Sequence, residues 1–118
     1  MNWFDKGEWI KTDDLQWRCK VNNTTYHLVE VRERPDDYVF VVGIIDIEDY
    51  TEDEIKSYIT GYGYESVGKM KEEYGEDTNG VIAECIFECT DIIELTGFGG
   101  FDTEDDAEKA AQEYIDRQ

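Results

Sequence analysis

The segment TTYHLVEVRERPDDYVFVVGIIDI, residues 24–47, decides the fold. Residues 24–33 are rich in β-branched and aromatic side chains, which are enriched in strands. Residues 38–47 form the most apolar run of the chain, a pattern typical of a central strand covered on both faces. Between them, Pro35-Asp36-Asp37 is a turn signal. We therefore predict an antiparallel pair of strands joined by a short turn.

A third strand is predicted just before this pair. Residues 17–21 alternate between apolar and polar side chains, as a half-buried strand does. Asn22-Asn23 favours a turn because asparagine tolerates positive φ. The result is a three-stranded antiparallel meander. Residues 1–16 form a lead-in segment that we expect to lie across the domain, because it carries apolar side chains at Trp3, Phe4, Trp9 and Ile10.

Helical patterns follow the meander. Thr51 and Glu54 have the spacing of a capping box, which starts a helix. A second helix is predicted from Ser66 to a stop at Gly75. The apolar faces of these two helices consist of Ile55, Tyr58, Ile59 and Tyr62, and of Val67, Met70 and Tyr74.

A last helix is predicted to begin at Thr103. Its first turn is acidic, which suits the positive end of the helix dipole. Its predicted core stripe is Ala107, Ala110, Ala111, Tyr114 and Ile115.

Residues 78–95 allow two interpretations. Ile82, Ile86, Cys89 and Ile93 have helical spacing, whereas Val81, Ala83, Cys85 and Phe87 alternate as in a strand. We favour the helix, because a strand would place Ile82 and Ile86 beside glutamates. Residues 92–101 are expected to form a short strand or an irregular return. The predicted fold is a single α+β domain over residues 1–118, with a three-stranded meander, or four strands, and three to four helices packed on one face of the sheet.

The charge is strongly negative. Asp and Glu total 30 against 11 Lys and Arg, for a net charge of −19. Residues 41–80 hold eleven acids and three bases, and residues 81–118 hold eleven and two. This charge disfavours direct binding to nucleic acid or to an anionic membrane, and it favours attraction to a basic protein surface.

The cellular setting is predicted from absences in the sequence. The N-terminus lacks the basic start and apolar run of a signal peptide. The longest apolar stretch, residues 39–45, is far shorter than the roughly 20 residues that span a bilayer. Three cysteines, an odd number, do not form a disulfide framework. We expect a cytoplasmic protein in a reducing compartment.

Candidate catalytic and metal-binding patterns are weak. His27 is the single histidine and is expected to be structural. Cys85 and Cys89 are four residues apart, with Cys19 distant, so core packing is favoured over a zinc site completed by Cys19 or His27.

Two further patterns lack an essential residue. Residues 102–113 resemble a calcium loop but carry Ala107 where glycine is required. Residues 97–101 are glycine-rich but lack the Lys-Ser/Thr of a phosphate loop. We therefore expect no enzyme activity, no metal and no cofactor.

What remains as a candidate site is the acidic surface with interleaved tyrosines, which supply amphipathic contact area. The alternative is a solvated face above core tyrosines. The predicted partner-binding residues are Asp46, Glu48, Asp49, Tyr50, Glu52, Asp53, Tyr62, Tyr64, Glu72, Glu73, Glu76, Asp77, Glu104, Asp105 and Glu108.

In size, acidity and lack of active-site motifs, the chain resembles the small anti-CRISPR and anti-restriction proteins of phages and mobile elements. The resemblance implies a DNA-mimic inhibitor whose carboxylates replace phosphates in the basic groove of a nucleic-acid-binding effector, such as a CRISPR nuclease complex. The protein would act as a monomer or homodimer. Two alternatives stay open, namely an accessory or structural interaction protein whose acidity serves only solubility, and a small metal-binding or enzymatic domain.

Overall fold

The computed structural model describes residues 9–12, 15–91 and 95–118. Trp3 and Phe4 of the predicted lead-in segment, and Ile93 of the predicted helical pattern, lie outside the described residues. Among the helices described, none has the length and apolar character needed to cross a bilayer.

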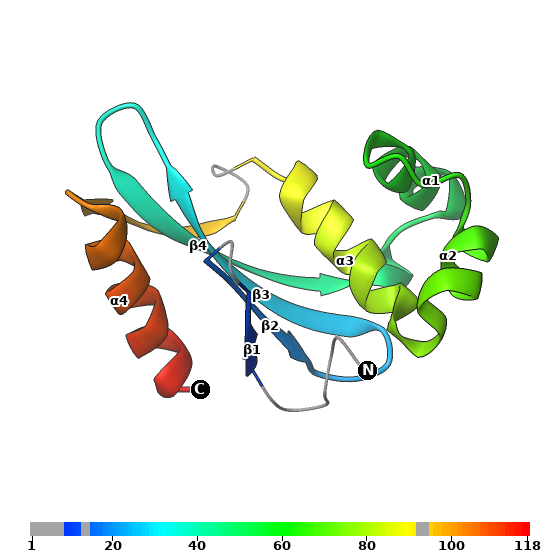
Figure 1. Ribbon diagram of the computed structural model, residues 1–118, viewed down its shortest axis with the longest axis horizontal. Coiled ribbons are helices and arrows are strands. Elements are labelled where there is room, and N and C mark those ends of the chain that lie inside the picture. Colours follow the sequence, from blue (N-terminus) through cyan, green and yellow to red (C-terminus); the bar gives the residue numbers. More distant parts are fainter. Residues whose placement is uncertain (1–8, 13–14, 92–94) are drawn as a thin grey trace.

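Five antiparallel strands form one sheet in the order in which they occur along the chain (Figure 1). The three predicted strands are present as β2 (Gln16–Lys20), β3 (Thr25–Glu33) and β4 (Tyr38–Asp46). In β3 and β4 every residue from Thr25 to Glu33 pairs with one from Asp46 to Tyr38. β4 is an inner strand, next to one edge of the sheet, and β3 holds the central position.

Two edge strands bring the total to five, so the expected three or four strands were too few. β1 (Trp9–Lys11) lies in the predicted lead-in segment, and β5 (Thr96–Phe101) lies within residues 92–101, where a short strand or an irregular return was expected. β1 has only three residues, too few to show alternation, and three of the six residues of β5 are glycines. Neither segment therefore carries the usual strand pattern.

The helices follow the predicted caps. Thr51 and Glu54 form the capping box of α1 (Glu52–Gly61), and Ser66 caps α2 (Val67–Tyr74). The ambiguous segment is the helix α3 (Thr78–Cys89), and Thr103 caps α4 (Glu104–Asp116). Two short 3₁₀ helices, η1 (Ile47–Asp49) and η2 (Gly75–Asp77), precede α1 and α3.

Helices cover both faces of the sheet, which corrects the prediction that they pack on one face. α1, α2 and α3 lie on one side, and α4 lies alone on the other (Figure 1). Adjacent residues of the inner strands point to opposite faces. Consequently Leu28 and Val41 pack in the core under α3, whereas Val29 and Val42 pack with Ala111 of α4.

The close approach of α3 to the sheet depends on Gly43 of β4. A Cβ atom at this position would lie 2.7 Å from Cδ1 of Phe87, which is closer than real Cβ contacts. Phe87 itself is fully buried. Glycine at this position therefore lets the aromatic ring lie directly on the strand.

Candidate binding surface

The predicted acidic residues fall at two opposite ends of an elongated molecule whose longest extent is 42 Å. Figure 1 shows α1 and α2 at one end and α4 at the other. Asp46, Glu48, Asp49, Glu52, Asp53, Glu72, Glu73, Glu76 and Asp77 belong to the α1–α2 end, and Glu104, Asp105 and Glu108 belong to α4. The structure therefore does not join all the predicted residues into one face.

At the junction of η1 and α1, acidic residues have two kinds of role. The Asp46 carboxylate accepts a hydrogen bond from the Glu48 backbone N–H at 3.0 Å and caps η1. Glu54 accepts one from the Thr51 N–H at 3.0 Å in the capping box. Four other exposed carboxylates are left at this junction. We call them the junction carboxylates: Glu48, Asp49, Glu52 and Asp53.

Five of the basic residues form ion pairs with acids outside this junction. In the part of the chain that the structure describes, the five ion pairs are Lys11–Glu108, Arg18–Glu84, Arg32–Glu30, Arg34–Asp37 and Lys69–Glu72. None includes a junction carboxylate. The negative charge at this junction is therefore not compensated locally by an ion pair among the described residues.

The acids near α2 differ from one another in exposure. Glu72, Glu73 and Glu76 are exposed, and Lys69 lies 3.9 Å from Glu72. Asp77 is only 7% exposed, so it does not belong to the surface. Burial, together with the charge of Asp77, raises the pKa of Tyr26 to about 12.

The predicted tyrosines are mostly packed against the core. Tyr50 meets Tyr58 edge to face at a ring distance of 5.9 Å, and the Tyr64 hydroxyl lies 3.0 Å from that of Tyr74. These rings are half-buried and contact the core under α3. Tyr62 is 48% exposed and is the predicted tyrosine that remains available for contact.

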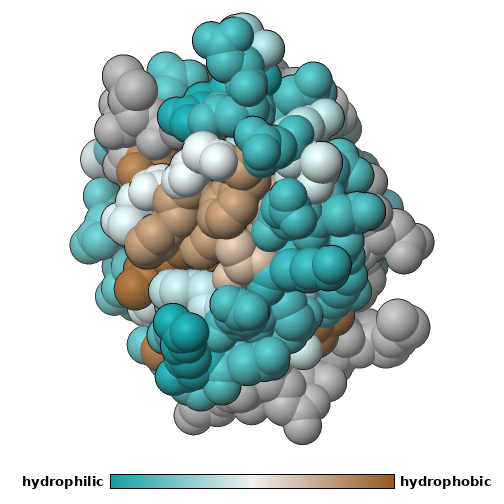
Figure 2. Space-filling model, turned by 90° about the vertical axis from the view of Figure 1, so that its left-hand side faces the viewer, coloured by the Kyte–Doolittle hydropathy of each residue, from teal (hydrophilic) through white to brown (hydrophobic). Residues whose placement is uncertain are grey.

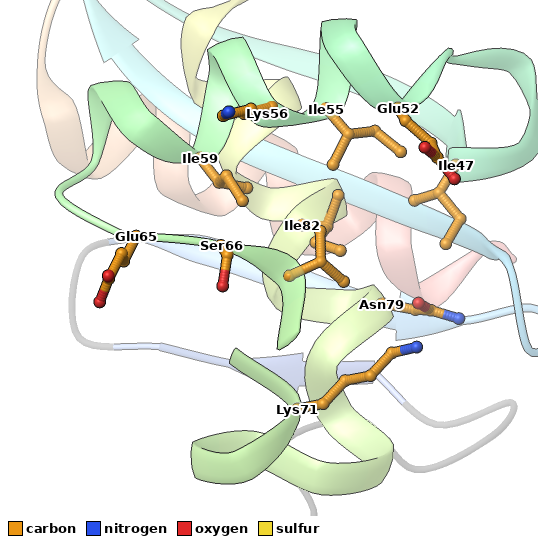
Figure 3. A pocket seen from close by; sticks show the side chains of 11 residues that line it. Ile47, Glu52, Ile55, Lys56, Ile59, Glu65, Ser66, Lys71, Asn79 and Ile82 are labelled. Atoms are coloured by element: carbon orange, nitrogen blue, oxygen red, sulfur yellow. The ribbon is translucent and has the colours of Figure 1, made fainter. Parts of the chain in front are cut away.

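A groove of about 500 Å³ lies beside the junction carboxylates, between α1, α2 and α3 (Figure 3). Its apolar lining comes from Ile47, Ile55, Ile59, Val67 and Ile82, and the labelled isoleucines converge on the hollow. Its polar lining comes from Glu52, Lys56, Glu65, Ser66, Lys71 and Asn79. No local sequence pattern indicates this groove, because its walls belong to three helices whose relative placement depends on tertiary packing.

The candidate ligands for a zinc ion are separated by the sheet. Cys19 lies opposite His27, which contacts Tyr114 of α4, so both face α4. Cys85 lies in α3 on the other face, and burial, then the charge of Glu84, raises the pKa of its thiol to about 12. His27 is held between Trp9, at a ring distance of 4.8 Å, and the Tyr114 hydroxyl, 3.0 Å from Nε2.

The α4 end also carries an apolar patch, surrounded by hydrophilic residues (Figure 2). Phe98 of β5 is 42% exposed and stacks on Phe40 at a ring distance of 4.7 Å. The glycine-rich loop pattern thus forms an uncharged edge strand. The Asp37 carboxylate accepts a hydrogen bond from the Gly100 N–H at 3.1 Å and ties β5 to the turn between β3 and β4.

A polar network between the sheet and α3 was not predicted. Gln16 is 3% exposed, and its side-chain amide donates to Glu30, at 2.9 Å, and to Glu88. Arg32 donates to Glu30 and to the carbonyl oxygens of Phe87 and Thr90. Glu30 shares a face of β3 with the buried Leu28, and a carboxylate at such a position is the sequence signal that could have indicated the network.

Two carboxyl groups in this network influence each other. Burial, and then the hydrogen bond with Glu30, raises the pKa of Glu88 to about 8. Glu88 therefore carries a proton near neutral pH and can donate it to Glu30, whose charge is balanced by Arg32. We assign this pair a structural role, because its partners fix the C-terminal half of α3 on the sheet.

No protein-family model, curated protein or solved structure matches the chain. The α1–α2 end therefore combines two features, which are the junction carboxylates and the apolar groove beside them. Such a surface can attract a cationic partner over a distance and hold it by contact with aliphatic side chains.

Proposed function

We propose that the protein is a non-enzymatic acidic inhibitor that binds the basic nucleic-acid-binding groove of a partner protein and excludes nucleic acid from it. The observation that carries the proposal is the cluster of junction carboxylates, exposed and without an ion pair in the described part of the chain. Such an activity would benefit a phage or a mobile element. The partner would then be a CRISPR nuclease or a restriction enzyme of the host.

The physical basis is competition between carboxylates and phosphates. Glu48 and Asp49 lie in η1, and Glu52 and Asp53 lie in the first turn of α1, so four negative charges are held within residues 48–53. A groove that neutralises phosphates with lysine and arginine would attract this stretch by the same interaction. The affinity should fall steeply with salt, because exposed charges are screened beyond about 8 Å at physiological ionic strength.

The test is a competition experiment with purified CRISPR nucleases and restriction enzymes. Binding of labelled duplex DNA to each enzyme is measured by fluorescence anisotropy while the protein is added, at about 0.1 M and about 0.5 M salt. We expect displacement of DNA from at least one enzyme at the lower salt and a large loss of affinity for that enzyme at the higher salt.

A matched pair of variants distinguishes a local surface from net charge alone. The first variant neutralises the junction carboxylates as Glu48→Gln, Asp49→Asn, Glu52→Gln and Asp53→Asn. The control removes four exposed charges at the α4 end, as Asp102→Asn, Glu104→Gln, Asp105→Asn and Glu113→Gln. Both variants keep the caps of their helices and change the net charge equally.

We expect the first variant to bind at least about tenfold more weakly and the control to bind nearly as well as the natural chain. Equal weakening in both would contradict a localised surface. Salt-insensitive binding would instead favour an accessory interaction protein whose acidity serves solubility.

A further inference from the structure

We propose that the groove between α1, α2 and α3 receives an aliphatic side chain from a basic segment of the partner. This inference rests on the proposed function and names the chemistry of the partner segment. That segment would carry a leucine-like residue flanked by lysines or arginines.

The floor of the groove fits an apolar side chain. Ile59 and Ile82 are almost fully buried, and Ile47, Ile55 and Val67 are half-buried around them. Ile55 belongs to α1 and Ile82 to α3, so the floor is anchored on two packed helices rather than on a loop. An inserted side chain would therefore exchange water for contact with aliphatic groups that are already fixed in place.

The charge around the groove selects a cationic segment. Residues 41–80, which include all the lining residues except Ile82, hold eleven acids and three bases. Glu52 belongs both to the groove lining and to the junction carboxylates, so the apolar site and the acidic cluster are continuous.

Lysines at the groove do not reverse this preference. Lys56 and Lys71 line it together with Glu52 and Glu65, which makes the lining itself balanced. Figure 3 shows the Lys71 side chain reaching toward Asn79, at one side of the converging isoleucines. The surrounding excess of carboxylates therefore decides the sign of the local field, and a small anionic amphiphile is disfavoured.

The test uses two synthetic peptides of equal charge. One is a short lysine peptide with leucines at positions i and i+4, and its counterpart carries serines at the same positions. Their affinities for the full chain are measured by fluorescence anisotropy, and NMR follows the methyl groups of Ile55, Ile82 and Val67. Sodium decanoate serves as an anionic amphiphile in a separate titration.

We expect the leucine peptide to bind about tenfold to a hundredfold more tightly than the serine peptide and to shift the groove methyl signals. The variant Ile55→Ser should abolish this difference. The control Ile44→Ser removes an isoleucine that is 67% exposed and lies outside the groove, and it should leave the difference unchanged. If Ile55→Ser does not fold, the methyl shifts of the natural chain still decide.

The outcomes separate the two proposals. Equal, salt-sensitive binding of both peptides, without groove shifts, overturns the groove assignment and leaves the proposed function standing. Tight binding of the leucine peptide that ignores salt supports the groove and contradicts the proposed function. Binding of neither peptide overturns the groove assignment, and the DNA competition experiment then decides the proposed function by itself. Groove shifts with decanoate but not with the leucine peptide would assign the site to a small anionic ligand instead.

Discussion

Glu30 and Glu88 illustrate how single residues between the sheet and α3 affect stability. Glu30 is paired with Arg32, whereas Glu88 is held neutral by burial and by its hydrogen bond with Glu30. The two glutamates therefore have different partners, although they belong to one network. The helical spacing of residues 78–95 did not indicate that Glu88 meets the sheet, because the partner strands are not adjacent to α3 in sequence.

The first prediction concerns Glu88→Gln. Glu88 binds its proton more tightly in the folded chain than in the unfolded chain, where its pKa is about 4.5. Its contribution to stability is therefore complete below about pH 4.5 and is lost as the pH rises through about 8. Glutamine stays neutral and keeps an acceptor for the Gln16 amide. We expect the variant to be more stable than the natural chain above pH 8, by on the order of 1 kcal/mol.

Urea denaturation at pH 5, 7 and about 9 measures this effect. The control Glu30→Gln should be destabilised at each of these pH values, because Arg32 loses its carboxylate. An equal stability difference at every pH for Glu88→Gln would contradict the assigned protonation.

The second prediction concerns Gly43. The variant Gly43→Ala should lower the free energy of unfolding by about 1–3 kcal/mol, because the added methyl group collides with the buried Phe87 ring. Gly61→Ala is the control, since a Cβ atom there meets nothing within 4 Å. Thermal denaturation should separate the two variants clearly, and equal effects would show that α3 can move away from β4 without loss.

At the scale of elements, sequence patterns predicted the features that depend on neighbouring residues, such as helix starts. The caps at Thr51, Ser66 and Thr103 were identified because each hydroxyl accepts a hydrogen bond from an N–H three residues later. The helix α3 was identified from isoleucines at helical spacing. What failed was the placement of α4, because its alanine stripe fits either face of the sheet. The continuous apolar run of β4, which places apolar side chains on both faces of the strand, had indicated that both faces of the sheet are covered.

The third prediction tests one of these caps. Thr51→Ala removes the acceptor for the Glu54 N–H and should cost about 1 kcal/mol in the free energy of unfolding. Thr51→Ser keeps a hydroxyl and should have little effect. The same pair of variants should leave the junction carboxylates in place, so a loss of binding in Thr51→Ala would reveal that the first turn of α1 must be ordered for recognition. Calorimetry of the two variants checks the stability difference.

At the scale of the whole molecule, the sequence predicted the amount of charge but not its distribution. Acidic residues are dense both in residues 46–54 and in residues 102–106. In the folded chain these two segments lie at opposite ends of a molecule whose longest extent is 42 Å. The groove is likewise a product of how three helices pack. A surface made of distant segments has no local signature, so the site could be predicted only as a set of candidate residues.

The last prediction concerns self-repulsion. With a net charge of −19, repulsion among carboxylates opposes the compact state more than the expanded one. Added salt screens this repulsion, and it also weakens the few exposed ion pairs, which contribute at most about 1 kcal/mol each. We therefore expect the melting temperature to rise by several degrees between about 0.02 M and about 0.5 M salt.

Potassium chloride and tetramethylammonium chloride should act equally, because screening depends on ionic strength. A falling melting temperature would contradict the dominance of repulsion, and a rise with one cation alone would indicate a specific ion site on this acidic surface.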